Sequence, residues 1–146
     1  MPQLTLPVAP EGCTLTVYVG VSSDRQAVLR AKRENIPEPI EINAMIDTGG
    51  SCTAIDAKKL VPLKMTPTGI GHIHTPSTKG QAAAMPQYDV SLAFVAPSGS
   101  FVASSVPIIA LPEISNTGID ALIGRDILSK CLLVYNGVEK KFTLAF

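Results

Sequence analysis

Apolar and polar residues alternate along most of this chain, so that within short segments every second side chain is apolar. This period of two is the pattern of half-buried strands, and glycine or proline residues separate the segments. Short strands with a turn about every ten residues predict an all-β fold, either a closed barrel or a sandwich. We predict strands at 2–6, 14–21, 40–46, 51–55, 69–74, 81–95, 101–111, 121–123, 132–135 and 141–146.

Two segments have the features of helices, and both are short. Asp56 precedes residues 57–60 and Asp126 precedes residues 127–131. An Asp at the N-cap accepts hydrogen bonds from the first backbone N–H groups of a helix. The polar, mixed segment 24–33 is instead predicted to pair with strand 14–21 across a hairpin loop.

Two further hairpins are predicted. Segments 69–74 and 81–95 read as one long hairpin with a polar, glycine-containing tip. On its second strand, Tyr88, Val90, Leu92 and Phe94 share one face. Near the end of the chain, the dipeptide at 136–137 is Asn-Gly, which strongly favours a two-residue hairpin turn.

Composition narrows the classes of function. A chain of 146 residues is long enough for a single domain over 1–146. Its 12 Lys and Arg balance 12 Asp and Glu, and without a basic excess we expect no nucleic-acid partner. No apolar run is long enough to span a bilayer, and the first residues lack the features of a signal peptide, so we expect no membrane association. The three cysteines are widely spaced, which indicates free thiols and a cytoplasmic location.

One carboxylate stands out. The apolar segment Ile42–Ile46 stops abruptly at Asp47, which is followed by Thr48 and two glycines, Gly49 and Gly50. Paired glycines allow a sharp turn and the close approach of another backbone. A carboxylate at the end of a buried strand is costly unless it is hydrogen-bonded or has a function. These residues alone support two interpretations equally, an Asp that begins a turn and an Asp that is catalytic.

Hydrolysis of an amide by carboxylates requires two of them. One is ionised and takes a proton from water, and the other is protonated and hydrogen-bonds the carbonyl. The chain has one Asp-Thr-Gly sequence, at 47–49. A symmetric homodimer would bring the Asp47 of each subunit to the two-fold axis and so supply the pair.

Several segments together resemble the retropepsins, the single-domain aspartic proteases of retroviral type. They are Asp47-Thr48-Gly49, the later segment Leu122–Asp126, the hairpin between them and the terminal strands. The resemblance covers nearly the whole chain, and the two motifs in this order are more specific than either alone. It implies a closed β-barrel of the acid-protease fold with one or two short helices. It also implies an aspartic endopeptidase that acts on peptides or proteins as a homodimer, without a cofactor.

The resemblance implies roles for individual residues. Asp47 would be the catalytic carboxylate, Thr48 would hydrogen-bond across the dimer axis, and Gly49 would let the substrate backbone come close. Leu122 would line a side-chain pocket, and the active-site loop would be supported by Gly124, Arg125 and Asp126. Substrate would also contact Gly50 and a flap that closes over it, made of Thr75, Pro76, Ser77, Thr78, Lys79 and Gly80.

Three features depart from the family. Gly50 stands where Ala or Ser is usual. Ser51 stands where the viral enzymes commonly have an Asp that pairs with the Arg of the Gly-Arg segment, so Arg125 needs another acceptor. The segment from Gly20 to Ile40 is longer than in the viral enzymes, so we expect the first hairpin to protrude.

Other chemistries fit less well. His72 and His74 lie on one face of a predicted strand and could join Cys52 or Cys131 around zinc, but no third ligand has a supporting spacing, so we expect no metal. Ser-His-Asp catalysis lacks a Gly-x-Ser-x-Gly sequence. The main alternative is a catalytically weak or inactive dimer that keeps the fold and binds peptides, because a fold alone does not guarantee activity.

The chain ends are predicted to hold the dimer. Residues 2–6 and 143–146 form short strands whose unpaired edges need a cover. Interleaving the ends of two subunits in one sheet would cover them and bury Leu144 and Phe146. The alternative is that these strands close the barrel of their own subunit.

Overall fold

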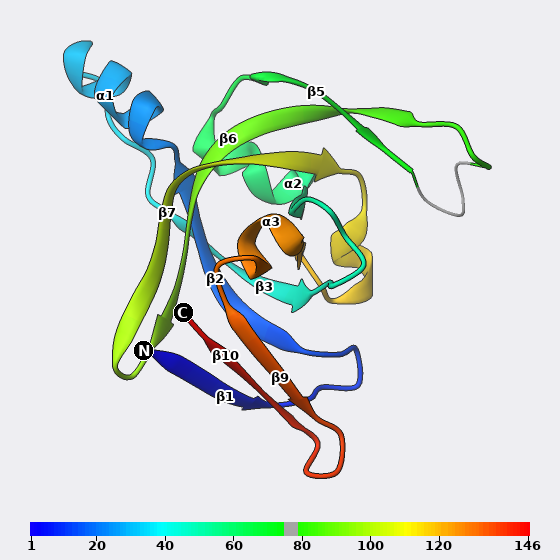
Figure 1. The fold of residues 1–146 in the computed structure, drawn as a ribbon. Coiled ribbons are helices and arrows are strands. Elements are labelled where there is room, and N and C mark those ends of the chain that lie inside the picture. The colour runs from blue at the N-terminus through cyan, green and yellow to red at the C-terminus, as the bar shows by residue number, and fades with distance from the viewer. Residues whose placement is uncertain (75–78) are drawn as a thin grey trace.

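The computed structural model describes residues 1–74 and 79–146. Its strands form a seven-stranded sheet in the order β2-β3-β8-β4-β7-β6-β5 and a three-stranded sheet in the order β1-β10-β9 (Figure 1). The strands are β1 (Gln3–Pro7), β2 (Thr14–Val21), β3 (Ile40–Ile46), β4 (Ala54–Asp56), β5 (Gly69–Ile73), β6 (Ala83–Ala96), β7 (Gly99–Leu111), β8 (Ala121–Ile123), β9 (Leu132–Asn136) and β10 (Lys141–Ala145). The helices are α1 (Ser23–Ala31), α2 (Ala57–Leu60) and α3 (Arg125–Leu128), with 3-10 helices η1 (Val61–Leu63) and η3 (Ile114–Thr117).

The larger sheet closes into a barrel because β2 pairs antiparallel with both β3 and β6. Two pairs within the barrel are parallel, β3 with β8 and β4 with β7. Strand β5 lies outside the closed ring and pairs with β6. The predicted all-β closed barrel is therefore confirmed, and the sandwich is not formed.

Alternate side chains of the barrel strands make the core, as the period of two predicts. Along β6, Val90, Leu92 and Phe94 are buried, and Tyr88 packs half-buried against the same cluster. Full burial of an aliphatic or aromatic side chain contributes roughly 1.5–3 kcal/mol, so the face predicted for this strand stabilises the barrel.

The predicted long hairpin is formed by β5 and β6 and extends beyond the barrel wall (Figure 1). Strand β5 lies so close to the side chain of Ile109 on β7 that a side chain at Gly71 would collide with it. Four residues of the predicted flap lie outside the described residues, namely Thr75, Pro76, Ser77 and Thr78. The other two are described, and both Lys79 and Gly80 have a positive φ, as expected in a tight turn.

The prediction of a strand partner at 24–33 was wrong, because these residues form helix α1 on the outside of the barrel (Figure 1). Ser22 caps the helix, and its side-chain oxygen accepts a hydrogen bond from the N–H of Arg25 at 3.2 Å. Within α1 only Leu29 is buried, so the sequence lacks the apolar stripe of a packed helix. The element that protrudes between β2 and β3 is therefore a helix and not a hairpin.

The two predicted short helices are present. Asp56 caps α2 as predicted, and its Oδ1 accepts a hydrogen bond from the N–H of Lys58 at 2.8 Å. Helix α3 begins earlier than predicted, at Arg125, and its N-cap is Gly124. Asp126 is not the N-cap because it lies within the helix, where its carboxylate accepts hydrogen bonds from Thr53 and from the N–H of Ile127. In the described part of the chain, no helix is long and apolar enough to cross a membrane.

The turn predicted at Asn136-Gly137 is longer than two residues. Asn136 pairs with Lys141, so the loop of this hairpin consists of residues 137–140. The side-chain oxygen of Asn136 accepts a hydrogen bond from the N–H of Glu139 at 3.0 Å. The loop residue with a positive φ is Lys140, not Gly137.

The two ends of the chain pair with each other. Strand β1 is antiparallel to β10, with Leu4 opposite Leu144, and β9 occupies the other edge of β10. Leu144 is 1% exposed, and the ring of Phe146 packs edge-on against Phe94 with centroids 4.9 Å apart. Both edges of β10 are thus occupied within one chain. Within one chain the ends therefore pair with each other, but in a separate three-stranded sheet and not in the barrel, where the alternative had expected them. The interleaving of ends between subunits stays a prediction.

Candidate active site

Asp47 follows β3 at the edge of the barrel where β3 and β8 end together. Its N–H donates to the carbonyl of Ile123 at 2.9 Å and extends the parallel pairing by one residue. The Asp47 carboxylate turns back onto its own loop, and Oδ1 accepts hydrogen bonds from the N–H groups of Gly49 at 3.0 Å and Gly50 at 3.1 Å. The strand and the two N–H groups together fix the position of this carboxylate.

The two glycines leave room for the carboxylate. A Cβ on Gly49 would lie 3.3 Å from Oδ1 of Asp47, and a Cβ on Gly50 would lie 3.0 Å from Oδ2. Neither glycine has a positive φ, so glycine is favoured here because a side chain would crowd the carboxylate and not because of the backbone conformation. Gly50, unusual for the family, therefore relieves crowding around the carboxylate.

Arg125 holds the Asp47 loop through backbone carbonyls. Its Nη1 donates to the carbonyl of Thr48 at 3.0 Å and to that of Gly49 at 3.3 Å, and its backbone N–H donates to the carbonyl of Gly50 at 2.9 Å. Hydrogen bonds from a charged donor are stronger than those between neutral groups. These carbonyls are the acceptors that Arg125 requires in the absence of an Asp at position 51.

Asp126 joins helix α3 to the segment that enters β4. Its Oδ2 accepts from the N–H of Thr53 at 2.9 Å, and its Oδ1 accepts from the Thr53 hydroxyl at 2.8 Å. The same hydroxyl oxygen accepts a hydrogen bond from the N–H of Gly124 at 3.2 Å. A Cβ on Gly124 would collide with the backbone of Cys52, so this close approach requires glycine. All three predicted supporting residues therefore contact segment 48–53.

A cleft of about 320 Å³ opens in front of Asp47, between its loop and the β5–β6 hairpin. Leu122, predicted to line a side-chain pocket, lies in its wall. Lys79 and Gly80 are not among the residues that line it. The cleft is lined by Asp47, Gly49, Gly50, Ser51, Cys52, Ala54, His72, Ile73, His74, Leu111 and Leu122.

Sequence reasoning missed several residues of this site. Ala54, Ile73 and Leu111 give the cleft an apolar wall, yet each looks like an ordinary strand residue in the sequence. Thr53 was also missed. The one feature of the sequence that sets it apart is that it is polar and directly precedes the apolar residues that begin β4. His72 and His74, interpreted as exposed residues of the flap, are exposed and also border the cleft.

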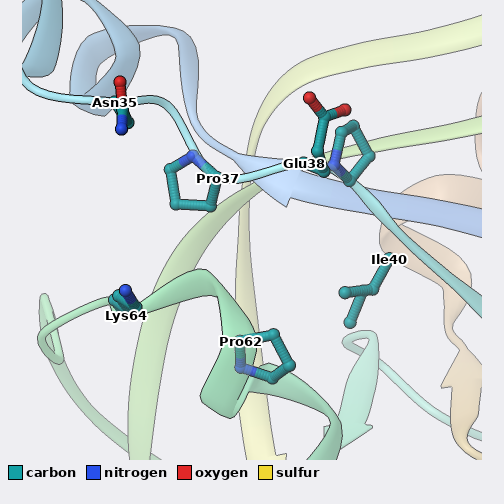
Figure 2. A pocket seen from close by; sticks show the side chains of 7 residues that line it. Asn35, Pro37, Glu38, Ile40, Pro62 and Lys64 are labelled. Atoms are coloured by element: carbon teal, nitrogen blue, oxygen red, sulfur yellow. The ribbon is translucent and has the colours of Figure 1, made fainter.

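A second hollow, of about 380 Å³, lies between the loop at 35–40 and η1 (Figure 2). Its charged residues are Glu38 and Lys64, and the carboxylate of Glu38 points away from Lys64 and Pro62 (Figure 2). The remaining lining is Asn35, Pro37, Pro39, Ile40 and Pro62. Because its polar groups do not converge, the cleft at Asp47 is the better candidate site.

Cys52 borders the cleft but is not an activated nucleophile. Burial raises the pKa of its thiol, the charge of Asp126 raises it further, and a hydrogen bond with the Ser51 side chain lowers it in part. A thiol with a raised pKa stays protonated at neutral pH. Within residues 1–74 and 79–146, no group of three His, Cys, Asp or Glu side chains could hold a metal ion.

No family model matches this sequence, and no curated protein matches it. Among solved structures, the fold is similar to that of a retropepsin-like aspartic protease from Rickettsia conorii, with a TM-score of 0.59 and 14% sequence identity. The similarity covers 99% of this chain and 90% of that one. This chain has a retropepsin-like fold. A weaker similarity, with a TM-score of 0.44 and 16% identity, is to the foamy viral protease-reverse transcriptase in complex with an RNA/DNA hybrid, over 80% of this chain and 12% of that one.

The structural similarity over 99% of the chain establishes the retropepsin-like fold, and the identity of 14% leaves the activity to be argued from the cleft. In this fold the predicted residues fall into two groups. One group borders the cleft and consists of Asp47, Gly49, Gly50 and Leu122. The other group holds the loop from behind and consists of Gly124, Arg125 and Asp126, with the carbonyl of Thr48 bound by Arg125.

Proposed function

We propose that this protein is an aspartic endopeptidase whose active site is completed by a second copy of the chain. The observation that carries the proposal is the carboxylate of Asp47, held by two backbone N–H groups at the mouth of a cleft with an apolar wall. A carboxylate that only began a turn would have no need of such a cleft. The retropepsin-like fold supports the same assignment.

The proposed reaction uses the two Asp47 carboxylates as a pair that shares one proton. The ionised carboxylate takes a proton from a water molecule, and the water oxygen attacks the carbonyl carbon of the peptide. The protonated carboxylate gives its proton to the carbonyl oxygen. When the tetrahedral intermediate collapses, the C–N bond breaks, and the carboxylate that took the proton from water gives it to the leaving amine. A hydroxyl of the intermediate returns its proton to the other carboxylate, so the pair again shares one proton.

The surrounding residues are proposed to position this pair. The N–H groups of Gly49 and Gly50 hold one carboxylate oxygen, which leaves the other turned toward Gly50 and the open loop. Thr48 is exposed on the same loop and is available to a second subunit. The apolar wall, which includes Leu122 and Ile73, suits an aliphatic substrate side chain. Closure of the β5–β6 hairpin over the substrate, with residues 75–80 as its tip, stays a prediction.

Two broader assignments accompany the proposal. We treat residues 1–146 as a single protease domain, supported by the match of 99% of the chain to one fold. Cys13, Cys52 and Cys131 are free thiols, which supports a cytoplasmic location because thiols persist in a reducing compartment.

The test is cleavage of a diverse peptide library, read by mass spectrometry, by the purified protein and by Asp47→Asn. We expect the wild-type protein to cut and the variant to fall to background, because Asn can neither accept nor supply the shared proton. Retained cleavage by Asp47→Asn would end the aspartic-protease proposal. Peptide binding without cleavage by the wild-type protein would favour the alternative of an inactive peptide-binding dimer.

A further inference from the structure

Helix α1 adds little to the core of the barrel. It lies outside the barrel between β2 and β3 (Figure 1), and Leu29 is the one residue of the helix that is buried. Helices in proteins are usually stabilised by packing an apolar face, whereas α1 presents mostly polar side chains. Its outer surface is therefore available to a partner.

The helix and the two residues after it carry an excess of positive charge. Segment 25–33 contains no Asp or Glu, and it holds four of the 12 Lys and Arg residues of a chain whose net charge is zero. These four are Arg25, Arg30, Lys32 and Arg33. In the described part of the chain, no salt bridge involves any of them. Their charge is thus free to attract an acidic partner.

A groove runs beside these cations, from α1 to the end of η1. One part of it, of about 240 Å³, is lined by the cations Arg25 and Lys64 and by the apolar side chains of Leu29 and Leu63. The other part is the hollow of about 380 Å³ between the loop at 35–40 and η1 (Figure 2). Both parts are lined by Asn35, Pro37 and Lys64, and we call them together the α1 groove.

The lining of the α1 groove suits an extended peptide that mixes acidic and apolar residues. Leu29, Leu63 and the proline rings offer contacts to aliphatic side chains, and Arg25 and Lys64 can bind carboxylates. The carboxylate of Glu38 points away from Lys64 and does not neutralise it (Figure 2). Glu34 also borders the groove, which disfavours a ligand that is acidic along its whole length.

A nucleic acid fits this groove less well. Residues 22–40 include no aromatic side chain on which a base could stack. The carboxylates of Glu34 and Glu38 would repel a continuous phosphate backbone. The charge and the apolar lining therefore favour a segment of a protein.

The α1 groove is separate from the cleft at Asp47. The two have no lining residue in common, so a peptide in the cleft leaves the groove open. Under the proposed function, on which this inference rests, a protein substrate can occupy both when it is long enough. A second contact between the same two molecules raises the effective concentration of the bond to be cut.

We propose that the α1 groove is an exosite, a docking site outside the active site, for a segment of the protein substrate in which acidic and apolar residues alternate. Arg25 and Lys64 bind the acidic side chains, and the remaining cations of segment 25–33 attract them from solution.

The experiment measures binding to the inactive Asp47→Asn protein by fluorescence anisotropy. One labelled peptide alternates Glu and Leu, and the other alternates Gln and Leu. The groove variant combines Arg25→Glu with Lys64→Glu. The matched control combines Lys130→Glu with Lys140→Glu, which changes the net charge equally at exposed positions, and Lys140 shares the positive φ of Lys64. Circular dichroism checks folding, and Lys64→Glu alone replaces a groove variant that does not fold.

A second measurement uses the active protein. Each of the two segments is attached to the same cleavable peptide from the library, and kcat/KM is compared between the two substrates. The ratio of the two values isolates the groove, because any effect on the cleft or on assembly is common to both substrates.

We expect the Glu peptide to bind about tenfold more tightly than the Gln peptide, and kcat/KM to favour the Glu substrate. The groove variant should lose both preferences and the control should keep them. A folded groove variant that keeps the preference overturns the proposal, as does equal binding of the two peptides. Tighter binding of labelled single-stranded DNA, lost in the groove variant, would assign the groove to nucleic acid and overturn it too. Binding that the groove variant loses, without cleavage of any peptide by the wild-type protein, supports the docking site and counts against the proposed function.

Discussion

Thr53 and Asp126 are joined by two hydrogen bonds, one from the Thr53 N–H at 2.9 Å and one from its hydroxyl at 2.8 Å. Thr53 lies in the segment that leaves the Asp47 loop, and Asp126 lies in the helix that carries Arg125. Thr53 is fully buried and Asp126 is half-buried, so these bonds are partly shielded from water. The pair links the loop to its supporting helix more firmly than an exposed contact would.

Replacing Thr53 by Val keeps the shape of the side chain and removes the hydroxyl. Asp126 then loses a donor and the N–H of Gly124 loses an acceptor. Leaving a buried polar group unsatisfied costs about 1–3 kcal/mol, and we expect a loss of that size in the free energy of unfolding. Urea denaturation measures it.

Thr5→Val is the matched control, because the Thr5 hydroxyl bonds to that of Thr143 at 2.8 Å on an exposed face of the small sheet. Its expected effect is within about 0.5 kcal/mol, as for most surface substitutions. Equal losses in the two variants would show that the burial of the Thr53 hydroxyl does not matter.

Arg125 is proposed as a positioning residue, which acts through the Asp47 loop. In Arg125→Met the carbonyls of Thr48 and Gly49 lose their donor, while the backbone bond to Gly50 remains. We expect kcat to fall about tenfold, which corresponds to roughly 1.4 kcal/mol of transition-state stabilisation. KM should change less, because the cleft walls are untouched.

The control for this prediction is Arg30→Met on α1, an exposed arginine outside the candidate site. It should leave both kinetic parameters unchanged. Arg125→Lys should restore part of the rate, since an ammonium group supplies charge but not the planar guanidinium. If Arg125→Met raised KM and left kcat unchanged, the residue would contribute to binding and not to positioning.

Asp56 makes the fold sensitive to acid. Burial alone would raise the pKa of this carboxyl, but hydrogen bonds from the N–H groups of Ser115 at 2.7 Å and Lys58 at 2.8 Å outweigh it, and the pKa lies below its ordinary value. A group whose pKa is lowered on folding stabilises the protein above its unfolded pKa, and the contribution is lost as pH falls through the folded pKa.

Asp56→Asn removes this carboxylate at every pH and isolates its effect. We expect the free energy of unfolding of the wild-type protein to exceed that of the variant near pH 6, with the difference shrinking toward about pH 3. Urea titrations at a series of pH values measure the difference. A gap that stayed constant with pH would contradict the stabilising role of the ionised form.

The rate of peptide cleavage should depend on pH as a bell with an acidic or mildly acidic optimum. The proposed pair works with one proton shared between two carboxylates, so both addition and removal of a proton inactivate it. Initial rates on one peptide identified from the library give the profile, and circular dichroism at each pH separates loss of rate from unfolding. A rate that is level from acidic to alkaline pH would argue against the paired mechanism.

Local pattern was enough to predict the barrel strands and the Asp47 turn. The segment Ile42–Ile46 is largely apolar, and its abrupt change to Asp-Thr-Gly-Gly marks where the strand must end. The cap at Asp56 was predictable for the same reason, since a carboxylate before a short helix binds the next N–H groups. Each of these features depends on residues close together in the sequence.

The features that were missed depend on partners distant in the sequence. Helix α1 buries only Leu29, so its apolar signal was too weak to separate it from a strand. Arg125 binds backbone carbonyls, and because every residue has one, its partners could not be recognised from the sequence. The pairing of β1 with β10 could not be predicted either, because apolar alternation identifies a strand without identifying its neighbour.

Arg125 binds backbone carbonyl oxygens, which every amino acid provides. Its hydrogen bonds to the loop therefore do not depend on the side chain at position 51. Ser51 is exposed at the rim of the cleft and takes no part in them. Where an Asp at this position secures the arginine, changing it would disturb the catalytic loop. Under the proposed function, position 51 of this chain is therefore suited to engineering: randomising it should alter peptide preference while the hydrogen bonds from Arg125 to the Asp47 loop are kept.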